Sequence, residues 1–139
     1  MHRKANQTKV FLSHSASERS LAMDLASRLS AAGFRVWHGE EVPPGDNWAL
    51  AVGKALEDSD AMVVLLSPDA VKSQAVGREI EYALSSPRFK NRLLPVVVKP
   101  TLGIPWILWR LPMIQLRDQP GADVDRIVEG VRKLVHTSN

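Results

Sequence analysis

Apolar residues along the chain gather in short runs with strand character, separated by longer stretches of helical periodicity. A run that is apolar throughout is typical of a central parallel strand buried on both faces, and Ala61–Leu66 has this pattern. The other runs are shorter and more mixed. We predict five strands in all, at Lys9–Ser13, Phe34–Trp37, Ala61–Leu66, Leu93–Val98 and Met113–Leu116.

The stretches between these runs carry helix signals. Ser15 and Glu18 have the spacing of a capping box at the start of the first helix, and Gly33 is placed to end that helix as its C′ residue. Pro68 suits the first position of a later helix. Pro95 would remove a ladder hydrogen bond in mid-sheet, so we expect it at the start of a strand or at a bulge. Apolar residues at helical spacing predict the inward faces, namely Leu21, Leu25 and Leu29; Ala51, Val52, Ala55 and Leu56; Val76, Ile80, Ala83 and Leu84; and Val124, Ile127, Val128, Val131, Leu134 and Val135.

Strands that alternate with helices predict an α/β fold. We expect a flavodoxin-like three-layer sandwich in which a five-stranded parallel sheet carries helices on both faces. The whole chain, residues 1–139, reads as one domain with a core of about residues 8–137. In such sheets a ligand binds beyond the carboxyl ends of the strands where the strand order reverses, here between the first and third strands. The loops there are 13–16 and 67–69, and the loop 39–46 could fold over them.

Composition narrows the function classes. The chain has no cysteine, and its four histidines are scattered without metal-ligand spacing, so we expect no metal site. No apolar stretch is long enough to span a bilayer, and no apolar signal-peptide core follows the basic N-terminus, which together predict a cytoplasmic location. The net charge of +3 is mild and spread along the chain. This charge argues against nucleic acid as a partner and is compatible with a phosphate-bearing small molecule.

An ordered set of motifs resembles the TIR (Toll/interleukin-1 receptor) domain family over about residues 8–117. Val10–Ser15 is similar to the first box of that family. Phe34–Trp37 followed by Pro44-Gly45-Asp46 is similar to the second box, which includes the BB loop, and Asp58–Pro68 resembles the third strand. Ser73 with Glu79 six residues later, and then Ala83, resembles the bacterial signature around the catalytic glutamate.

The chain departs from the family pattern at two places. TIR enzymes commonly carry Trp four residues before the glutamate, where this chain has Ala75. Many also carry an acidic residue just after the second strand, where this chain has His38-Gly39. The second departure leaves an acidic role at the start of the BB loop to Glu40 or Glu41.

The resemblance implies an enzyme that cleaves the nicotinamide–ribose bond of NAD⁺. Such an NAD⁺ nucleosidase or ADP-ribosyl cyclase would act as a bacterial, anti-phage defence or signalling effector, with NAD⁺ as substrate and no further cofactor. Nicotinamide leaves readily because it is positively charged, so the reaction needs stabilisation of an oxocarbenium-like ribose more than a general acid. A single carboxylate beside the developing cation can supply it.

Glu79 is the residue that we expect to carry this chemistry. Ala75 and Ala83 lie one turn to either side of it on the same helical stripe and leave room for a ligand. Glu81 lies about 200° around the helix, so the two carboxylates cannot line one crevice. Arg78 is three residues from Glu81, with which it can pair.

The remaining candidate site residues come from the loops around this crevice. Ser13 and His14 are not a catalytic dyad, because neighbours at a strand end point to opposite faces. Ser15 also has a competing role as a helix cap. Phosphates could meet the helix start near Ser15, or Arg19 or Arg78. For substrate binding we select Ser13, His14 and Ser15 after the first strand, Trp37 and Trp48 as stacking rings, Gly45 in the BB loop, and Ser73.

The same residues favour or exclude three alternative functions. A non-catalytic scaffold would use the fold for TIR–TIR contacts through the loop 39–46 and other surfaces. Trp106 and Trp109 are expected to pack as a loop cluster, and an exposed pair would indicate a protein contact. A two-component receiver needs an acidic pair after the first strand and an Asp ending the third, where this chain has Ser13-His14 and Ser67. A nucleoside deoxyribosyltransferase would show a different strand-end pattern.

Overall fold

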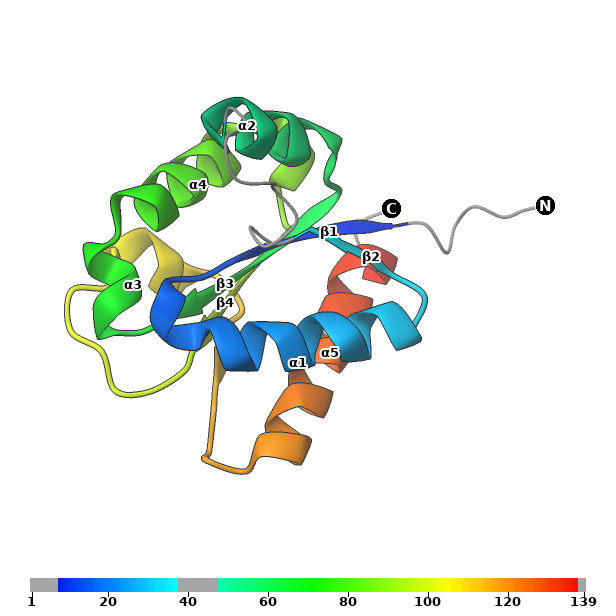
Figure 1. The fold of residues 1–139 in the computed structure, drawn as a ribbon, viewed down its shortest axis with the longest axis vertical. Helices are drawn as coiled ribbons and strands as arrows, with labels where there is room; N and C mark the ends of the chain where they lie inside the picture. The colour runs from blue at the N-terminus through cyan, green and yellow to red at the C-terminus, as the bar shows by residue number, and fades with distance from the viewer. Residues whose placement is uncertain (1–7, 38–47, 138–139) are drawn as a thin grey trace.

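The computed structural model describes residues 8–37 and 48–137. Its five strands form one parallel sheet in the order β2-β1-β3-β4-β5. This order confirms the predicted flavodoxin-like architecture, because the strand order reverses at β1 and β3: β2 is added on one side of β1, and β3, β4 and β5 follow on the other (Figure 1). The strands are β1 (Lys9–Ser13), β2 (Arg35–Trp37), β3 (Ala61–Leu66), β4 (Leu93–Val97) and β5 (Ile114–Gln115).

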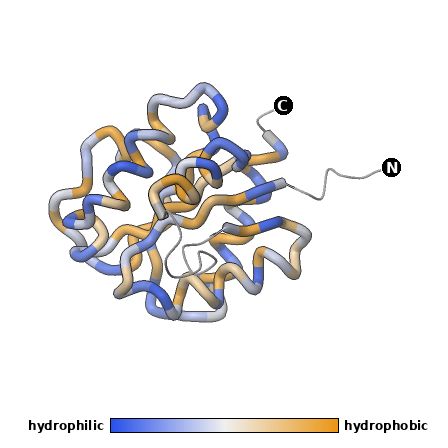
Figure 2. Tube along the Cα trace, turned by 45° about the horizontal axis from the view of Figure 1, so that its top comes forward, coloured by the Kyte–Doolittle hydropathy of each residue, from blue (hydrophilic) through white to orange (hydrophobic). Residues whose placement is uncertain are grey.

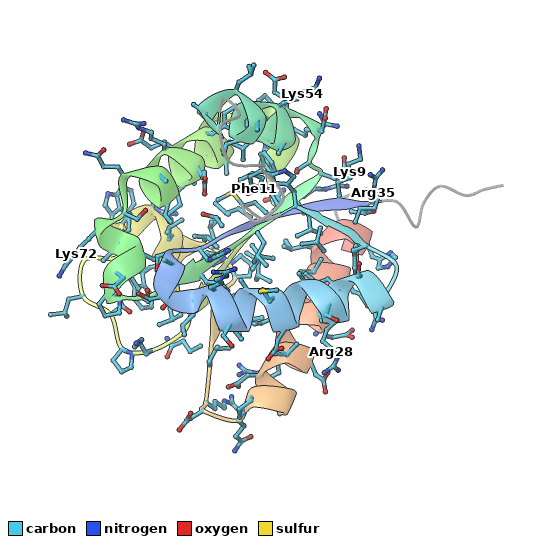
Figure 3. The ribbon with its side chains drawn as sticks, in the orientation of Figure 1. Lys9, Phe11, Arg28, Arg35, Lys54 and Lys72 are labelled. Atoms are coloured by element: carbon cyan, nitrogen blue, oxygen red, sulfur yellow. The ribbon has the colours of Figure 1, made fainter. Side chains whose placement is uncertain are left out.

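Helices cover both faces of this sheet. Helices α1 and α5 lie side by side on one face, where Arg28 of α1 pairs with Asp125 of α5 (Figures 1 and 3). The opposite face carries α2 and α4, with the short α3 at the end of β3. The helices are α1 (Arg19–Ala31), α2 (Trp48–Asp58), α3 (Pro68–Lys72), α4 (Gln74–Ser85) and α5 (Pro120–Thr137), with 3₁₀ turns η2 (Ala16–Glu18), η4 (Pro87–Phe89) and η5 (Trp106–Arg110).

The core consists of two layers separated by the sheet. Successive residues of a strand point to opposite faces, so Phe11 packs in the layer beneath α2 and α4 while Val10 and Leu12 pack in the layer beneath α1 and α5. All six residues of β3 are buried, as predicted for a central strand. The strands accordingly form the apolar interior of the tube in Figure 2.

Two helix ends follow the sequence signals, those after α1 and before α3. Gly33 has a φ of +99° after α1, and the N–H of Phe34 donates to the Leu29 carbonyl, which is the Schellman arrangement. Pro68 is the first residue of α3, and Ser67 caps that helix by accepting a hydrogen bond from the Ala70 N–H. The predictions for Gly33 and Pro68 are therefore confirmed.

Pro95 corrects one expectation, because it lies in the middle of β4 in register with Val64 and not at a strand end or bulge. Its position in the ladder explains why the sheet tolerates it. Val98 donates to Leu66 of β3, whereas the Val97 carbonyl accepts from the Leu116 N–H on the opposite side. Bonding sides alternate along a strand, so the Pro95 nitrogen faces the β5 side. The two residues of β5 pair only with Val96 and Val97, so no ladder bond is lost there.

The predicted burial of Leu84 is wrong. We expected it on the buried face of α4, but it is 42% exposed, while Val76, Ile80 and Ala83 are buried as predicted. Leu84 is the last apolar residue of the stripe and lies next to the C-terminal residue of α4. Among the described residues, no helix combines the length and apolar character needed to cross a membrane.

Candidate functional site

A pocket of about 440 Å³ lies at the carboxyl ends of the adjacent strands β1 and β3. This is the position predicted from the reversal of strand order. Its wall combines residues that follow β1, a residue at the end of β2, the first turn of α3 and one face of α4. The described lining residues are Leu12, His14, Ser15, Ala16, Trp37, Asp69, Ser73, Ala75 and Glu79.

Glu79 contributes the buried carboxylate of this pocket. It is only 7% exposed, and the Ser13 hydroxyl donates a hydrogen bond to its Oε1 at 2.6 Å. Burial raises the pKa of Glu79, and the hydrogen bond from Ser13 partly opposes that rise. Among the described residues Ser13 is the only hydrogen-bond partner of this carboxylate, so Oε2 is left for a ligand.

The local sequence explains how these two side chains meet. Ser13 is the last residue of β1 and points to the same face as Phe11, two residues earlier, which is the face covered by α4. Ser73 begins α4 by accepting a hydrogen bond from the Val76 N–H at 3.2 Å. Six residues later, Glu79 is buried and bonds Ser13 while Glu81 is exposed, which is the separation by direction that we predicted.

Ser13 and Ser73, which we predicted at the site, each make a hydrogen bond within the protein. Ser13 is buried behind Glu79 and is not among the lining residues, whereas Ser73 lines the pocket and caps α4 with the same oxygen. Ala75 also lines the pocket, so the departure from the family pattern at this position lies in the pocket wall itself. Arg78 and Glu81, which we expected could pair, form no ion pair with each other in the described part of the chain.

Glu18 is a second buried carboxylate near the pocket, and it corrects the predicted capping box. Ser15 precedes the 3₁₀ turn η2, but its side chain makes no capping bond to the backbone. Its hydroxyl instead donates to Glu18 Oε1 at 2.6 Å, and the Ser67 hydroxyl donates to the same oxygen at 2.7 Å. Glu18 is 5% exposed, and through these two bonds its carboxylate links the turn after β1 to the end of β3.

Trp37 and His14 form the remaining polar and aromatic parts of the wall. The Trp37 ring stacks on Phe11 with centroids 4.8 Å apart and 16° between the planes. Trp37 is half-buried and lines the pocket, so its side chain can both pack against the core and contact a ligand. His14 Nδ1 lies 2.8 Å from the Ser15 carbonyl oxygen. Because Ser13 bonds Glu79 and His14 bonds this carbonyl, the two form no Ser–His dyad.

A larger groove of about 500 Å³ lies between α5 and the strands β4 and β5, but it lacks comparable chemistry. Among its described lining residues Glu129 is the only carboxylate, and it is exposed and pairs with Arg132. Among the described residues, no group of three or more His, Cys, Asp or Glu is arranged to hold a metal ion. The buried carboxylate therefore distinguishes the pocket at β1 and β3 as the candidate active site.

Comparison with known proteins settles the family. A family model described as a TIR domain matches residues 10–131, which is most of the chain. The chain belongs to the TIR domain family.

Solved structures agree with this assignment of the fold. The TIR domain of the Toll-related receptor TRR-2 from Hydra magnipapillata is 20% identical with a TM-score of 0.72, and the match covers 88% of this chain and 97% of that one. A chain from the RPS4 and RRS1 TIR domain heterodimer is 14% identical with a TM-score of 0.61, covering 92% of this chain and 97% of its own. A comparison with curated proteins finds no significant match.

Part of the site predicted for this TIR domain lies outside the described residues. Gly45 and the loop 39–46 belong to that part, and of Trp48 only the backbone at the start of α2 is described. The described lining residues include no Lys or Arg, so they offer no cationic side chain for the predicted phosphate contacts. Arg78 is exposed beside the pocket, and Lys72 points outward from α3 (Figure 3).

Trp106 and Trp109 correct another expectation for the TIR domain. We predicted a packed cluster, but the two side chains are 71% and 52% exposed on η5, and Leu102 just before them is 92% exposed. Sequence reasoning placed the loop 67–69 at the ligand site but did not select Asp69, which lines the pocket and accepts a hydrogen bond from Ser17. Its position directly after the Ser67-Pro68 helix start was the available signal.

Proposed function

We propose that this TIR domain cleaves the bond between nicotinamide and ribose in NAD⁺, as a nucleosidase or ADP-ribosyl cyclase. The observation that carries the proposal is the buried Glu79 carboxylate at the pocket, with one oxygen held by Ser13 and the other free of described partners. A fixed anion in a site of low dielectric stabilises positive charge more strongly than an anion in water does.

The reaction matches what such a carboxylate can do. The bond between C1′ of the ribose and the pyridinium nitrogen breaks, and its electron pair neutralises the departing nicotinamide. C1′ and the ring oxygen then share a positive charge, which Glu79 stabilises electrostatically and through the ribose hydroxyls. Addition of water at C1′ with loss of a proton gives ADP-ribose, whereas addition of a nitrogen of the adenine gives a cyclic product.

The surroundings of Glu79 support this use. Trp37 offers a flat face in the same pocket, on which a nicotinamide ring can stack. Ala16 and Ala75 line the pocket with small side chains and leave space beside the carboxylate. Ser13 favours the ionised form of Glu79, which is the form that the cationic transition state needs.

Nicotinamide release from NAD⁺ tests the proposal. The purified protein is incubated at high concentration with NAD⁺, and nicotinamide is followed by chromatography for wild type, Glu79→Gln and Glu81→Gln. Removing the Glu79 charge should lower the rate by at least about 100-fold. Glu81→Gln is the matched control, since the same change is made on the exposed face of the same helix. Release that persists unchanged in Glu79→Gln would remove this residue from the mechanism.

Protein association is a second candidate function, favoured by the exposed rings of Trp106 and Trp109. In this view the domain binds further copies of itself, and the loop 39–46 stays a predicted contact outside the described residues. Sedimentation velocity over a range of concentrations should show weaker self-association for Trp106→Ser/Trp109→Ser than for wild type. Equal self-association of the variant and the wild type would exclude the two Trp rings from the contact between copies. The cytoplasmic location and the role in bacterial defence stay predictions from the sequence.

A further inference from the structure

Half of the large apolar side chains that are exposed in the described chain lie within one short segment, residues 102–109. They are Leu102, Trp106 and Trp109, and the other three are scattered over α1, α2 and α4. The two tryptophans are three residues apart in the 3₁₀ turn η5, and side chains at that spacing eclipse each other in a 3₁₀ helix. Both rings therefore stand on one side of η5, while Leu108 between them is buried in the core.

The turn beside Leu102 is packed against the protein although Leu102 itself is 92% exposed. Gly103 follows it with a φ of +85°, a left-handed conformation that favours glycine. A Cβ at Gly103 would lie 3.9 Å from Val71 Cγ2, so the turn contacts the end of α3 (Figure 1). This contact brings Leu102 to the side of α3 on which Val71 and the last residue of the helix, Lys72, lie.

The charges around these apolar side chains are positive. Residues 82–117 contain six Lys or Arg and no Asp or Glu. Arg110 directly follows Trp109, and Lys72 points outward from the adjacent α3 (Figure 3). Both cations are exposed, and neither forms an ion pair within the part of the chain that the structure describes. We call this set the tryptophan surface: Leu102, Trp106, Trp109, Lys72 and Arg110.

Area and charge together indicate what the tryptophan surface binds. The two rings expose roughly 200–300 Å² between them, whereas a stable protein interface buries about 800 Å² on each partner. Taken alone, the rings therefore fall short of a stable contact with a second copy. A bilayer demands no matched area, because single indole rings insert among the headgroups with their apolar body inward and their N–H in a polar layer. Anionic headgroups also complement the unpaired Lys72 and Arg110.

We propose that the tryptophan surface docks the domain on a membrane that contains anionic lipid. Leu102 and the two rings insert at the level of the headgroups, and Lys72 and Arg110 contact lipid phosphates. The contact is peripheral, since only side chains of short surface segments enter the bilayer. This inference goes beyond the proposed function, because none of the five residues lines the pocket of Glu79.

Cosedimentation of the full chain with lipid vesicles tests the proposal. One set of vesicles contains phosphatidylcholine alone, and the other contains phosphatidylcholine and phosphatidylserine in equal amounts. Wild type should bind the mixed vesicles at least about tenfold more tightly, because each Lys or Arg at an anionic surface contributes about fivefold. Added salt should weaken this binding by screening the charges. Brominated lipid quenches indole fluorescence inside the bilayer, so it should quench bound wild type and leave Trp106→Ser/Trp109→Ser, which keeps Trp37 and Trp48, unquenched.

Two variants separate the apolar and the charged parts of the surface. Trp106→Ser/Trp109→Ser and Lys72→Gln/Arg110→Gln should each lower the affinity for mixed vesicles by at least about tenfold. Met23→Ser is the matched control for an exposed apolar residue, on α1, and Lys54→Gln/Arg132→Gln removes the same charge from α2 and α5. Both controls should stay within about threefold of wild type, because charges beyond a Debye length of the membrane are screened.

Several results would overturn the docking of this surface on a membrane. They are no binding of wild type to mixed vesicles, equal binding to both kinds of vesicle, unchanged binding of either surface variant, and bound wild type that brominated lipid does not quench. Self-association that the two tryptophan substitutions weaken, without binding of wild type to vesicles, would assign the tryptophan surface to a second copy of the domain instead.

Discussion

Replacing Ser13 with alanine isolates the hydrogen bond that holds the Glu79 carboxylate. Ser13 is buried and lies 2.6 Å from Glu79 Oε1, so the change removes one oxygen atom and leaves a side chain of similar size. The bond stabilises the ionised form of Glu79 more than the protonated form. We therefore predict that Ser13→Ala raises the pKa of Glu79 above its already elevated wild-type value.

The size of the effect follows from the two protonation states of Glu79. A hydrogen bond to a charged group contributes about 1.5–3 kcal/mol, and a bond between neutral groups about 0.5–1.5 kcal/mol. Their difference of about 1–1.5 kcal/mol corresponds to a pKa rise of about one unit. The free energy of unfolding should accordingly fall by about 1.5–3 kcal/mol at pH 7. Below the pKa of the unfolded chain the carboxyl is neutral in both states, so the loss should shrink to about 0.5–1.5 kcal/mol.

Two measurements check this prediction. The ¹³C chemical shift of the Glu79 carboxyl group reports its pKa directly, and urea denaturation at pH 7 and pH 3.5 gives the two free energies. Ser85→Ala is the control, because Ser85 lies on the same helix and bonds only backbone carbonyls at its exposed end. An unchanged or lower pKa for Glu79 in Ser13→Ala, or an equal loss of stability at both pH values, would refute the reasoning.

Three further predictions concern stability. Glu79→Gln removes a buried charge, so it should raise Tm by a few degrees at pH 8, a gain that disappears as the pH falls below the ordinary glutamate pKa. Gly77→Ala places a methyl group on α4 where, apart from the adjoining residues and backbone of the helix itself, no heavy atom lies within 4 Å, and chemical denaturation should show about 0.5–1 kcal/mol of added stability. Burial raises the pKa of Asp123, but bonds from the N–H groups of Arg117 and Gln119 and the charge of Arg126 lower it more. Asp123→Asn should therefore lower the free energy of unfolding by about 1–3 kcal/mol at pH 7, and the loss should fade as the pH drops through the lowered pKa.

The strands were predictable because local patterns determine them, and their order followed from the expected flavodoxin-like arrangement of alternating strands and helices. The apolar run Ala61–Leu66 identified the central strand, and Gly33 and Pro68 marked helix ends by their backbone preferences. Pro95 was misplaced because its tolerance depends on which neighbour its nitrogen faces and on how short that neighbour is. Neither fact is visible in the residues around Pro95 itself.

The pocket was predictable in position but not in its hydrogen bonds. Strand order and helix direction were enough to place Glu79 near the crevice. The bond from Ser13 joins residues 66 apart, and the bond from Ser67 to Glu18 joins residues 49 apart. A local capping box accounted for Ser15 and Glu18 equally well from sequence, so only tertiary packing reveals that Glu18 is buried.

Two buried carboxylates at the same edge of the sheet have different hydrogen-bonding surroundings, and this difference separates their roles. Glu18 receives two hydroxyls on one oxygen, joins two loops and does not line the pocket. Glu79 receives a single hydroxyl, keeps an oxygen toward the pocket and has a raised pKa because it is desolvated. A charge buried with so little compensation lowers stability, which makes Glu79 a candidate functional group in this pocket. In the reaction that we propose, a cationic ribosyl pyridinium would supply positive charge beside Glu79, and the oxocarbenium ion formed from it would place that charge on the ribose.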